Sequence, residues 1–298
     1  MNLIPDSIRK WLKSKIVYVV KEEYRKNPYL SALKTSKLYY RYRSASDFYI
    51  VKKNNSEQIL KCEYDLNIPP KKLWLGYGEN SAEYLNGKIQ INKMLKIASN
   101  HGYNPENPGN ILDFGCGAGR MIRWLKPYSE NKEIWGVDIS SEHIIWANNN
   151  LNPPFNFAVN TVVPHLPFRD NYFDFIYAGS VFTHIDDLAD SWFMELHRIS
   201  SDNAYLYLTI QDRHTIELLE TKYREKWLSG YMRKFPEYNS EKENFNIIVG
   251  GRGPDSQVFY DIDYLKKVLS NVFEFVSVNQ EAYGYQTALL LRKKSKKS

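Results

Sequence analysis

The chain has 298 residues, of which 43% are hydrophobic and 15% aromatic, a composition typical of a folded, soluble protein. Its two cysteines, Cys62 and Cys116, are too few for a disulfide framework, which favours a reducing compartment. No apolar run reaches the ~18 residues of a membrane-spanning helix, and the N-terminus lacks the apolar core of a signal peptide. We therefore expect a cytoplasmic protein, with peripheral contact to the inner face of the membrane as a further option.

The net charge of +6 is unevenly distributed along the chain. Residues 1–50 carry +7 and residues 292–298 carry +5, whereas the body between them carries −6. Because nucleic-acid-binding domains present a basic patch or groove, the acidic body argues against a DNA partner. Attraction to an anionic membrane is expected to start at the two basic ends.

The first 80 residues predict an N-terminal extension. Residues 7–26 place apolar side chains at helical spacing with basic residues between them, which indicates an amphipathic basic helix. This helix would cover an apolar flank of the domain or, alternatively, lie on a membrane surface. Residues 27–80 are rich in tyrosine and irregular, and their pattern assigns no fold.

From residue 81 onward, short apolar strands alternate with helical stretches. After a helix over residues 81–100, strands are expected at 111–114, 133–137, 155–159, 173–178, 204–210, 272–278 and 287–291, and helices at 119–126, 141–149, 186–199 and 261–270. This alternation predicts a Rossmann-like, doubly wound α/β fold with a mostly parallel seven-stranded sheet and an antiparallel edge strand. The expected domain spans 81–292, with an aromatic and basic insertion at 212–258 and a basic tail at 293–298.

A glycine-rich turn at residues 113–120 carries the strongest chemical signal. It lies between the first strand and the next helix, where glycines let the backbone approach a ligand above the strand ends. The second strand ends at Asp138, whose carboxylate would meet a ribose diol if a nucleoside crossed the sheet. A dinucleotide site would have a glycine in place of Arg120, and Asp113 would repel a pyrophosphate but suit a cationic ligand.

With these residues the sequence resembles the class I S-adenosylmethionine-dependent methyltransferases over about residues 81–291. The glycine-rich turn is similar to their first motif and Asp138 to their acidic second motif. Residues 166–177 are similar to the LPF…FD stretch that leads into their fourth strand, and residues 195–199 to the helix before their fifth. The subset most similar in these stretches is bacterial and often found with polysaccharide assembly.

The resemblance implies S-adenosyl-L-methionine as the cofactor. It implies that Asp113 faces the amino group, that Asp138 accepts from both ribose hydroxyls and that Ile139 packs on the adenine. Asn160 stands where many relatives have an Asp that accepts from the adenine amine. The cofactor-binding residues implied in this way are Asp113, Gly115, Cys116, Gly117, Gly119, Arg120, Asp138, Ile139, Asn160, Thr161 and Gly179.

The acceptor side offers two histidines as candidate catalytic residues. Methyl transfer from a sulfonium is an in-line displacement, and a hydroxyl acceptor benefits from a base. His184 follows the fourth strand in a Phe-Thr-His-Ile stretch and is the first candidate; alternatively it caps the next helix or binds the cofactor carboxylate. His214 follows the fifth strand and is the second candidate. No ligand cluster suggests a metal, and none is expected.

The acceptor itself is constrained only weakly by the sequence. Residues 152–155 read Asn-Pro-Pro-Phe, a tetrad of amino-methylating enzymes, but they precede the third strand instead of following the fourth, so a loop is expected. We expect methylation of a hydroxyl on a sugar, a glycan-linked or a small-molecule acceptor. Methylation of a lipid intermediate or of RNA, and a non-catalytic cofactor-binding partner protein, are the alternatives. The 212–258 insertion would bind the acceptor or form a helical lid.

Overall fold

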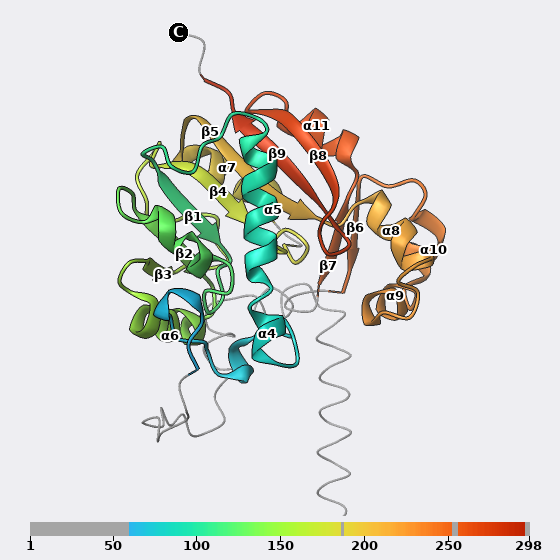
Figure 1. The fold of residues 1–298 in the computed structure, drawn as a ribbon. Helices are drawn as coiled ribbons and strands as arrows, with labels where there is room; N and C mark the ends of the chain where they lie inside the picture. Colours follow the sequence, from blue (N-terminus) through green and yellow to red (C-terminus); the bar gives the residue numbers. More distant parts are fainter. Residues whose placement is uncertain (1–59, 186–187, 252–255, 296–298) are drawn as a thin grey trace, which may run out of the picture. The chain divides into compact units, whose positions relative to one another are not determined.

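The structure is a computed structural model that describes residues 60–185, 188–251 and 256–295. The basic helix expected at residues 7–26 lies outside the described residues. The described part is built around a seven-stranded sheet of order β3-β2-β1-β4-β5-β9-β8 (Figure 1). Its strands are β1 (Asn110–Phe114), β2 (Ile134–Asp138), β3 (Asn156–Val159), β4 (Phe173–Ala178), β5 (Ser200–Ile210), β8 (Phe273–Tyr283) and β9 (Gln286–Lys293).

Neighbouring strands pair in parallel from β3 through β5, whereas β9 runs antiparallel to both β5 and β8. The expected doubly wound, mostly parallel α/β sheet is therefore confirmed. The antiparallel strand β9 lies one position in from the edge, between β5 and the edge strand β8.

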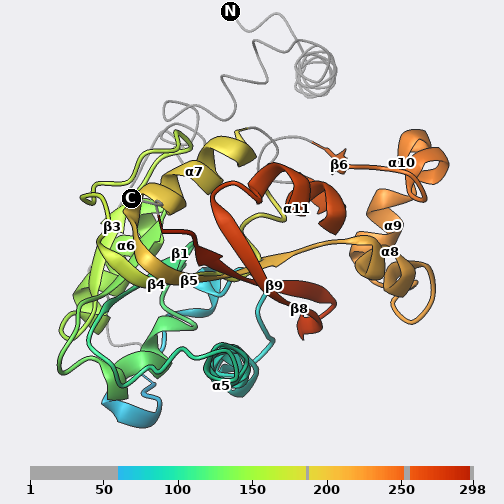
Figure 2. The same cartoon turned by 90° about the horizontal axis from the view of Figure 1, so that it is seen from above.

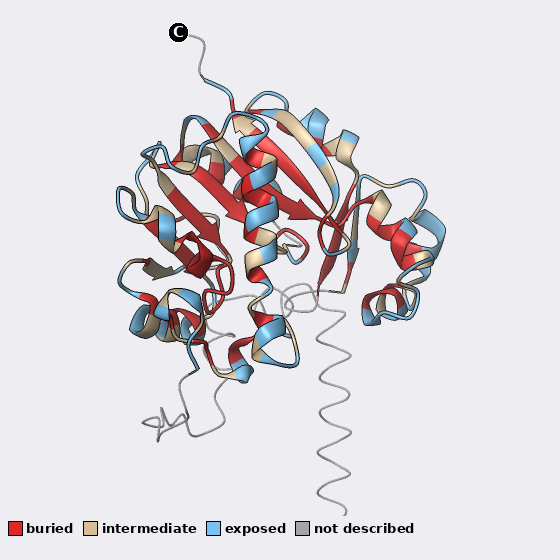
Figure 3. Ribbon diagram, viewed as in Figure 1, coloured by how far each residue is buried: buried red, intermediate tan, exposed pale blue. Residues whose placement is uncertain are grey.

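Helices cover both faces of the sheet because successive strand residues point to opposite sides. In β1, Ile111 packs in one buried cluster with α5 (Gly87–Ser99), η3 (Ile122–Tyr128) and α6 (Ser141–Leu151). Its neighbour Leu112 belongs to a second buried cluster, which includes residues of α7 (Ala189–Ile199) and α11 (Ile262–Leu269). Figure 2 shows α7 and α11 on the face opposite α5, and Figure 3 shows that the central strands are buried.

Two predicted helices differ from the structure at the glycine-rich turn. The helix expected at 119–126 is the short 3-10 helix η3, because Gly119 stays in the turn at a φ of +76°. The helix expected at 81–100 is split into α4 (Ser81–Tyr84) and α5. A Cβ at Gly87 would lie 2.4 Å from the carbonyl oxygen of Arg120, so the first residue of α5 must be small where it meets the turn.

The 212–258 insertion forms a small unit beside the end of β5. It contains α8 (Arg213–Glu220), α9 (Trp227–Met232), α10 (Pro236–Glu241) and the antiparallel pair β6 (Ile247–Gly250) and β7 (Gln257–Tyr260). It has its own apolar core, which consists of Ile216, Leu219, Leu228, Met232, Tyr238 and Phe259. A bridge between Gln211 and Phe259 joins β7 to the residue after β5.

Both ends of the domain differ from the predicted boundaries. Residues 60–80, with η1 (Glu63–Asp65) and η2 (Lys71–Leu73), pack on the sheet domain, since Leu66 is buried and the Trp74 ring stacks on Tyr84 at 5.1 Å. At the other end, Lys293 belongs to β9, and its buried Nζ donates to Asn171 Oδ1 and to the Ser200 carbonyl, each at 2.7 Å. No helix within the described ranges is long and apolar enough to cross a membrane.

Candidate active site

The glycine-rich turn lies over the carboxyl end of β2. The backbone N–H groups of Gly115 and Cys116 donate to the Val137 carbonyl at 2.8 and 3.0 Å. A Cβ on Gly115 would lie 2.3 Å from Val181 Cγ2, so only glycine fits there. Gly117 is buried, and its φ of +53° favours glycine, although a Cβ there would make only an ordinary contact with Leu75 Cδ1 at 3.4 Å.

Asp113 places a buried carboxyl group directly below this turn. Its side chain is 2% exposed, and its Oδ2 has no hydrogen-bond partner among the described residues. Burial raises the pKa of Asp113 to about 7, although the nearby Tyr177 hydroxyl and Arg120 guanidinium lower it. A buried carboxyl group with an unused oxygen is suited to a cationic ligand.

Asp138, at the end of β2, is held by two backbone donors. Its Oδ2 accepts from Gly117 N and its Oδ1 from Ser140 N, both at 2.8 Å. Burial raises the pKa of Asp138 while these two N–H groups lower it. Because each carboxylate oxygen has a second lone pair, both oxygens keep acceptor capacity for a ligand diol.

Arg120 presents a buried guanidinium to the same cavity as Asp113. Its NH1 donates to Gln90 Oε1 at 2.6 Å, its NH2 donates to the Tyr283 hydroxyl, and its Cζ lies 4.0 Å from the centre of the Tyr77 ring. None of these three partners carries a formal negative charge. Arg120 and Asp113 therefore bring opposite charges to one narrow cavity at the turn.

The cavity is lined by part of the predicted residue set together with residues that the sequence did not indicate. Of the predicted residues, those that line it are Asp113, Gly115, Cys116, Gly117, Arg120 and Gly179. Gly119 does not line it, because this glycine packs on α6: a Cβ there would lie 2.3 Å from Leu151 Cδ1. The unpredicted lining residues are Leu73, Trp74, Leu75, Tyr77, Tyr84, Ala118, Met121 and Tyr283.

The remaining predicted cofactor residues lie along the ends of β2 and β3, outside the cavity lining. Ile139 is 46% exposed immediately after Asp138, an accessible apolar side chain at this edge. Asn160 is buried, and its Nδ2 donates to the Thr161 carbonyl at 3.0 Å while its Oδ1 has no partner among the described residues. The Thr161 hydroxyl contacts the backbone of Val163.

His143 is a further polar residue at this edge that sequence reasoning missed. It lies in the first turn of α6, is buried, and its Nδ1 lies 2.6 Å from Ser140 Oγ. Its Nε2 has no partner among the described residues, and its Cδ2 lies 3.9 Å from the position of a Cβ on Gly117. His143 follows Asp138 by five residues and lies at the start of the next helix, and this spacing is the sequence signal that would have indicated a site residue.

The first candidate base, His184, is exposed in the loop after β4 and is anchored by the insertion. Its Nδ1 lies 2.8 Å from the Ser256 carbonyl oxygen, and Ser256 Oγ donates to the His184 carbonyl at 2.8 Å. The amide of Gln257 lies 3.4 Å from the same Nδ1. His184 does not line the cavity at the glycine-rich turn.

The second candidate base, His214, lies between two acidic side chains at the start of α8. Its Nδ1 is 3.4 Å from Glu217 Oε2 and its Nε2 is 3.6 Å from Glu281 Oε1. His214 is also absent from the cavity lining. In the part of the chain that the structure describes, no group of three or more His, Cys, Asp or Glu side chains could hold a metal ion.

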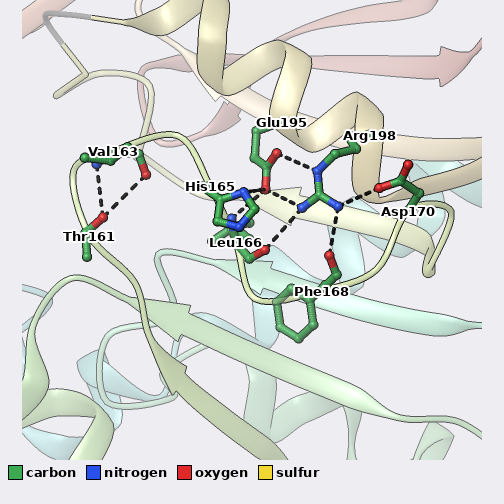
Figure 4. A network of polar contacts seen from close by, with 8 residues as sticks. All are labelled: Thr161, Val163, His165, Leu166, Phe168, Asp170, Glu195 and Arg198. Carbon is green, nitrogen blue, oxygen red and sulfur yellow. Dashed lines mark hydrogen bonds and ion pairs between the residues drawn. The ribbon is translucent and has the colours of Figure 1, made fainter.

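A polar network holds together the two sequence stretches that precede β4 and β5. Arg198 donates to Glu195 at 2.7 and 2.8 Å, to Asp170 Oδ1 at 2.7 Å and to the carbonyls of Leu166 and Phe168 (Figure 4). Burial opposes ionisation of Glu195, but Arg198 and the Leu166 N–H hold its pKa below the usual value. These motif residues therefore fix a loop, which explains their pattern without a catalytic role.

Comparisons with known proteins agree with this geometry. A family model described as a methyltransferase domain matches residues 112–208. Ribosomal RNA small subunit methyltransferase C of Alcanivorax borkumensis is 28% identical over 101 residues, which cover 29% of this chain and 30% of that protein. The chain thus spans less than a third of that curated relative.

A solved structure shares the fold. The PH0226 protein of Pyrococcus horikoshii OT3 has a TM-score of 0.53 and 19% identity, over 74% of this chain and 95% of that chain. A SAM-dependent methyltransferase from Methanosarcina mazei has 23% identity and a TM-score of 0.46, over 66% of this chain and 97% of that chain. Residues 112–208 are therefore similar to a methyltransferase domain, and S-adenosyl-L-methionine is the cofactor that such a domain implies.

The residues present fit this cofactor. It carries an ammonium, a carboxylate, a ribose diol and an adenine amine. The structure offers an unused carboxylate oxygen at Asp113, a guanidinium at Arg120, two acceptor oxygens at Asp138 and an unused amide oxygen at Asn160. These groups lie at or just after the carboxyl ends of β1, β2 and β3, where ligands of open α/β sheets bind.

Proposed function

We propose that the domain transfers the methyl group of S-adenosyl-L-methionine to a hydroxyl group of a sugar or glycan-linked acceptor. The observation that carries this proposal is the anchored imidazole of His184 at the carboxyl end of β4. The segment that follows β4 is Gly179-Ser180-Val181, and it lacks the Asn-Pro-Pro-aromatic tetrad of amino-methylating enzymes. That tetrad lies instead in the turn between α6 and β3, as expected.

The anchoring of His184 fixes which ring nitrogen can act as a base. A carbonyl oxygen only accepts hydrogen bonds, so the Ser256 carbonyl at 2.8 Å requires a proton on Nδ1. In the neutral imidazole, Nε2 is then the free acceptor. An acceptor hydroxyl bound beside this loop would give its proton to Nε2 as its oxygen bonds to the methyl carbon, while the bond between that carbon and the sulfonium sulfur would break and the sulfur would leave as a neutral thioether.

The cofactor supplies an electrophilic methyl group on a sulfonium when it is bound. In the proposed arrangement Asp113 receives the ammonium, Arg120 the carboxylate and Asp138 the ribose hydroxyls. Asn160 accepts from the adenine amine through Oδ1, and Ile139 packs on the ring. These residues orient the donor, and orientation is the main protein contribution to an in-line displacement.

The glycan character of the acceptor is supported by the insertion. Its segment 256–257 holds His184, so the loop that would carry the base and the unit rich in aromatic and basic side chains are directly connected. Aromatic faces and cations together suit saccharides that carry anionic groups.

The test is methyl labelling. The purified protein and S-adenosyl-L-methionine with an isotopically labelled methyl group are incubated with separate glycan, lipid and RNA fractions of host cells. We expect label in the glycan fraction that withstands alkali, as a methyl ether does and a methyl ester does not. At a limiting cofactor concentration, Asp138→Ala should reduce this label. Label confined to RNA, the substrate class in the name of the ribosomal RNA relative, or to lipids would overturn the glycan assignment.

The role of His184 is tested with His184→Asn, which can still donate to the Ser256 carbonyl but offers no base. We expect turnover to fall by about 10²-fold or more, with cofactor affinity unchanged by calorimetry. His101→Asn, an exposed histidine in the loop after α5, is the matched control. Unchanged turnover of His184→Asn would remove His184 as the base.

A further inference from the structure

An exposed aromatic surface on α9 belongs to no part of the site described above. Trp227 is 66% exposed, the highest value among the large apolar side chains of the described residues. Its ring stacks on Tyr231 with centroids 4.9 Å apart and planes 14° apart. One face of the indole is therefore covered by Tyr231, and the exposed area belongs to the opposite face and the edges.

This aromatic pair is held firmly by the insertion. Tyr231 packs edge-on against Phe235 at 5.3 Å, and both rings pack on the small core of the insertion. On the same helix, Leu228 and Met232 are buried, and the buried Ser229 donates through Oγ to the Leu219 carbonyl at 2.7 Å. A fixed aromatic plane loses little conformational entropy when a ligand stacks on it.

The surroundings of the plane are basic and open. Residues 222–234 contain five Lys or Arg and one Glu, although residues 51–291 as a whole carry −6. Arg224, Lys226 and Lys234 are exposed, and each lies within three residues of Trp227 or Tyr231 in the chain. A Cβ on Gly230, within α9, would meet no atom within 4 Å, so there is open space on this side of the helix.

A single aromatic plane among cations favours a saccharide over a lipid surface. A membrane-binding surface groups several apolar side chains together. The chain neighbours of Trp227 are the exposed Lys226, which precedes α9, and the buried Leu228. The other large apolar residues of the insertion that are exposed, Ile247 and Val249, belong to β6. A pyranose ring instead needs one flat apolar face, with polar groups around it.

We propose that Trp227 and Tyr231 form a docking platform for a pyranose unit of an acidic glycan, whose phosphate or carboxylate groups pair with Arg224, Lys226 and Lys234. The proposal rests on the glycan acceptor proposed above: the platform would hold a unit of the acceptor distant from the methylated hydroxyl. Because Lys and Arg pair with anions in an exposed setting, binding should weaken with salt.

Direct binding tests the platform without methyl transfer. The full-length protein is applied to immobilised oligosaccharides that carry glucuronate or phosphate, to neutral oligosaccharides of equal length, to vesicles containing phosphatidylglycerol and to single-stranded RNA. We expect the acidic oligosaccharides to bind best. Trp227→Ala should weaken that binding by about tenfold, whereas Trp227→Tyr, which keeps a flat ring, should stay within about threefold.

Matched controls separate the plane from general surface effects. Ile89→Ala removes another exposed apolar side chain, 63% exposed on α5, and should leave binding unchanged. Lys226→Glu should weaken binding at low salt more than at high salt. Binding to vesicles or RNA that depends on Trp227, or acidic-oligosaccharide binding that Trp227→Ala leaves intact, would overturn the proposal, as would no saccharide binding at all.

The two proposals fail in different ways. If Trp227→Ala methylates the glycan fraction with an unchanged KM for the acceptor, the platform is wrong and the glycan acceptor stands. If saccharide binding depends on Trp227 but label appears only in RNA or lipid, the platform stands as a binding site and the glycan acceptor is wrong.

Discussion

Replacing Asp113 with Asn should stabilise the ligand-free domain near neutral pH and weaken cofactor binding. The Asp113 carboxyl is buried with an unused Oδ2, and its pKa rises from 3.8 to about 7. Between these two values the folded protein binds more protons than the unfolded chain, so stability falls as the pH rises and the loss is complete above about pH 7.

The size of the effect follows from that shift. One pKa unit corresponds to about 1.4 kcal/mol, so between about pH 5 and about pH 8 the wild-type protein should lose about 3 kcal/mol of unfolding free energy to this one group. Asp113→Asn removes the titration. The advantage of the variant over the wild type should therefore grow by about 3 kcal/mol over the same pH range, or roughly 6 to 12 °C in Tm.

Denaturant unfolding of the wild type and Asp113→Asn at about pH 5 and about pH 8 measures this difference in stability. Calorimetry with S-adenosyl-L-methionine measures the expected loss of cofactor affinity. Asn cannot neutralise the ammonium, so cofactor affinity should fall. Asp263→Asn, an exposed carboxyl in α11, is the control and should change neither. An equal pH dependence of stability in Asp113→Asn and the wild type would refute the reasoning, as would unchanged cofactor affinity.

Three further substitutions test the site and its support. Asp138→Ala should weaken cofactor binding by about 1 to 3 kcal/mol in calorimetry, because the diol loses charge-assisted acceptors; full affinity would exclude the ribose role. Gly119→Ala should destabilise the domain by about 1 to 3 kcal/mol in thermal unfolding, since its Cβ would lie 2.3 Å from Leu151 Cδ1. An unchanged Tm would show that Leu151 in α6 moves away without cost. Arg198→Ala should cost about 3 kcal/mol of stability, because Glu195 would remain buried without its partner; Glu195→Gln combined with it should recover part of the loss.

The sequence determined the sheet and the chemistry of the central turn. β1 and β4 could be predicted because each is a short apolar run that is buried on both faces of the sheet. β5 and β8 extend through polar residues to 11 residues each, beyond the apolar runs expected at 204–210 and 272–278. Asp113, Gly115, Gly117 and Asp138 could be predicted because the end of a strand and the turn after it fix where such residues lie, whatever packs around them.

Only the tertiary structure decided what surrounds that turn. Tyr77 and Tyr283 lie 206 residues apart in the chain, yet their hydroxyls are 3.1 Å apart beside Arg120. No periodic pattern marks such residues, because their position depends on how the segment 71–77 and β8 fold back onto the sheet. The same holds for His184, whose free ring nitrogen is fixed by a carbonyl 72 residues further on. Local patterns encode elements, whereas long-range packing chooses the neighbours that complete the site.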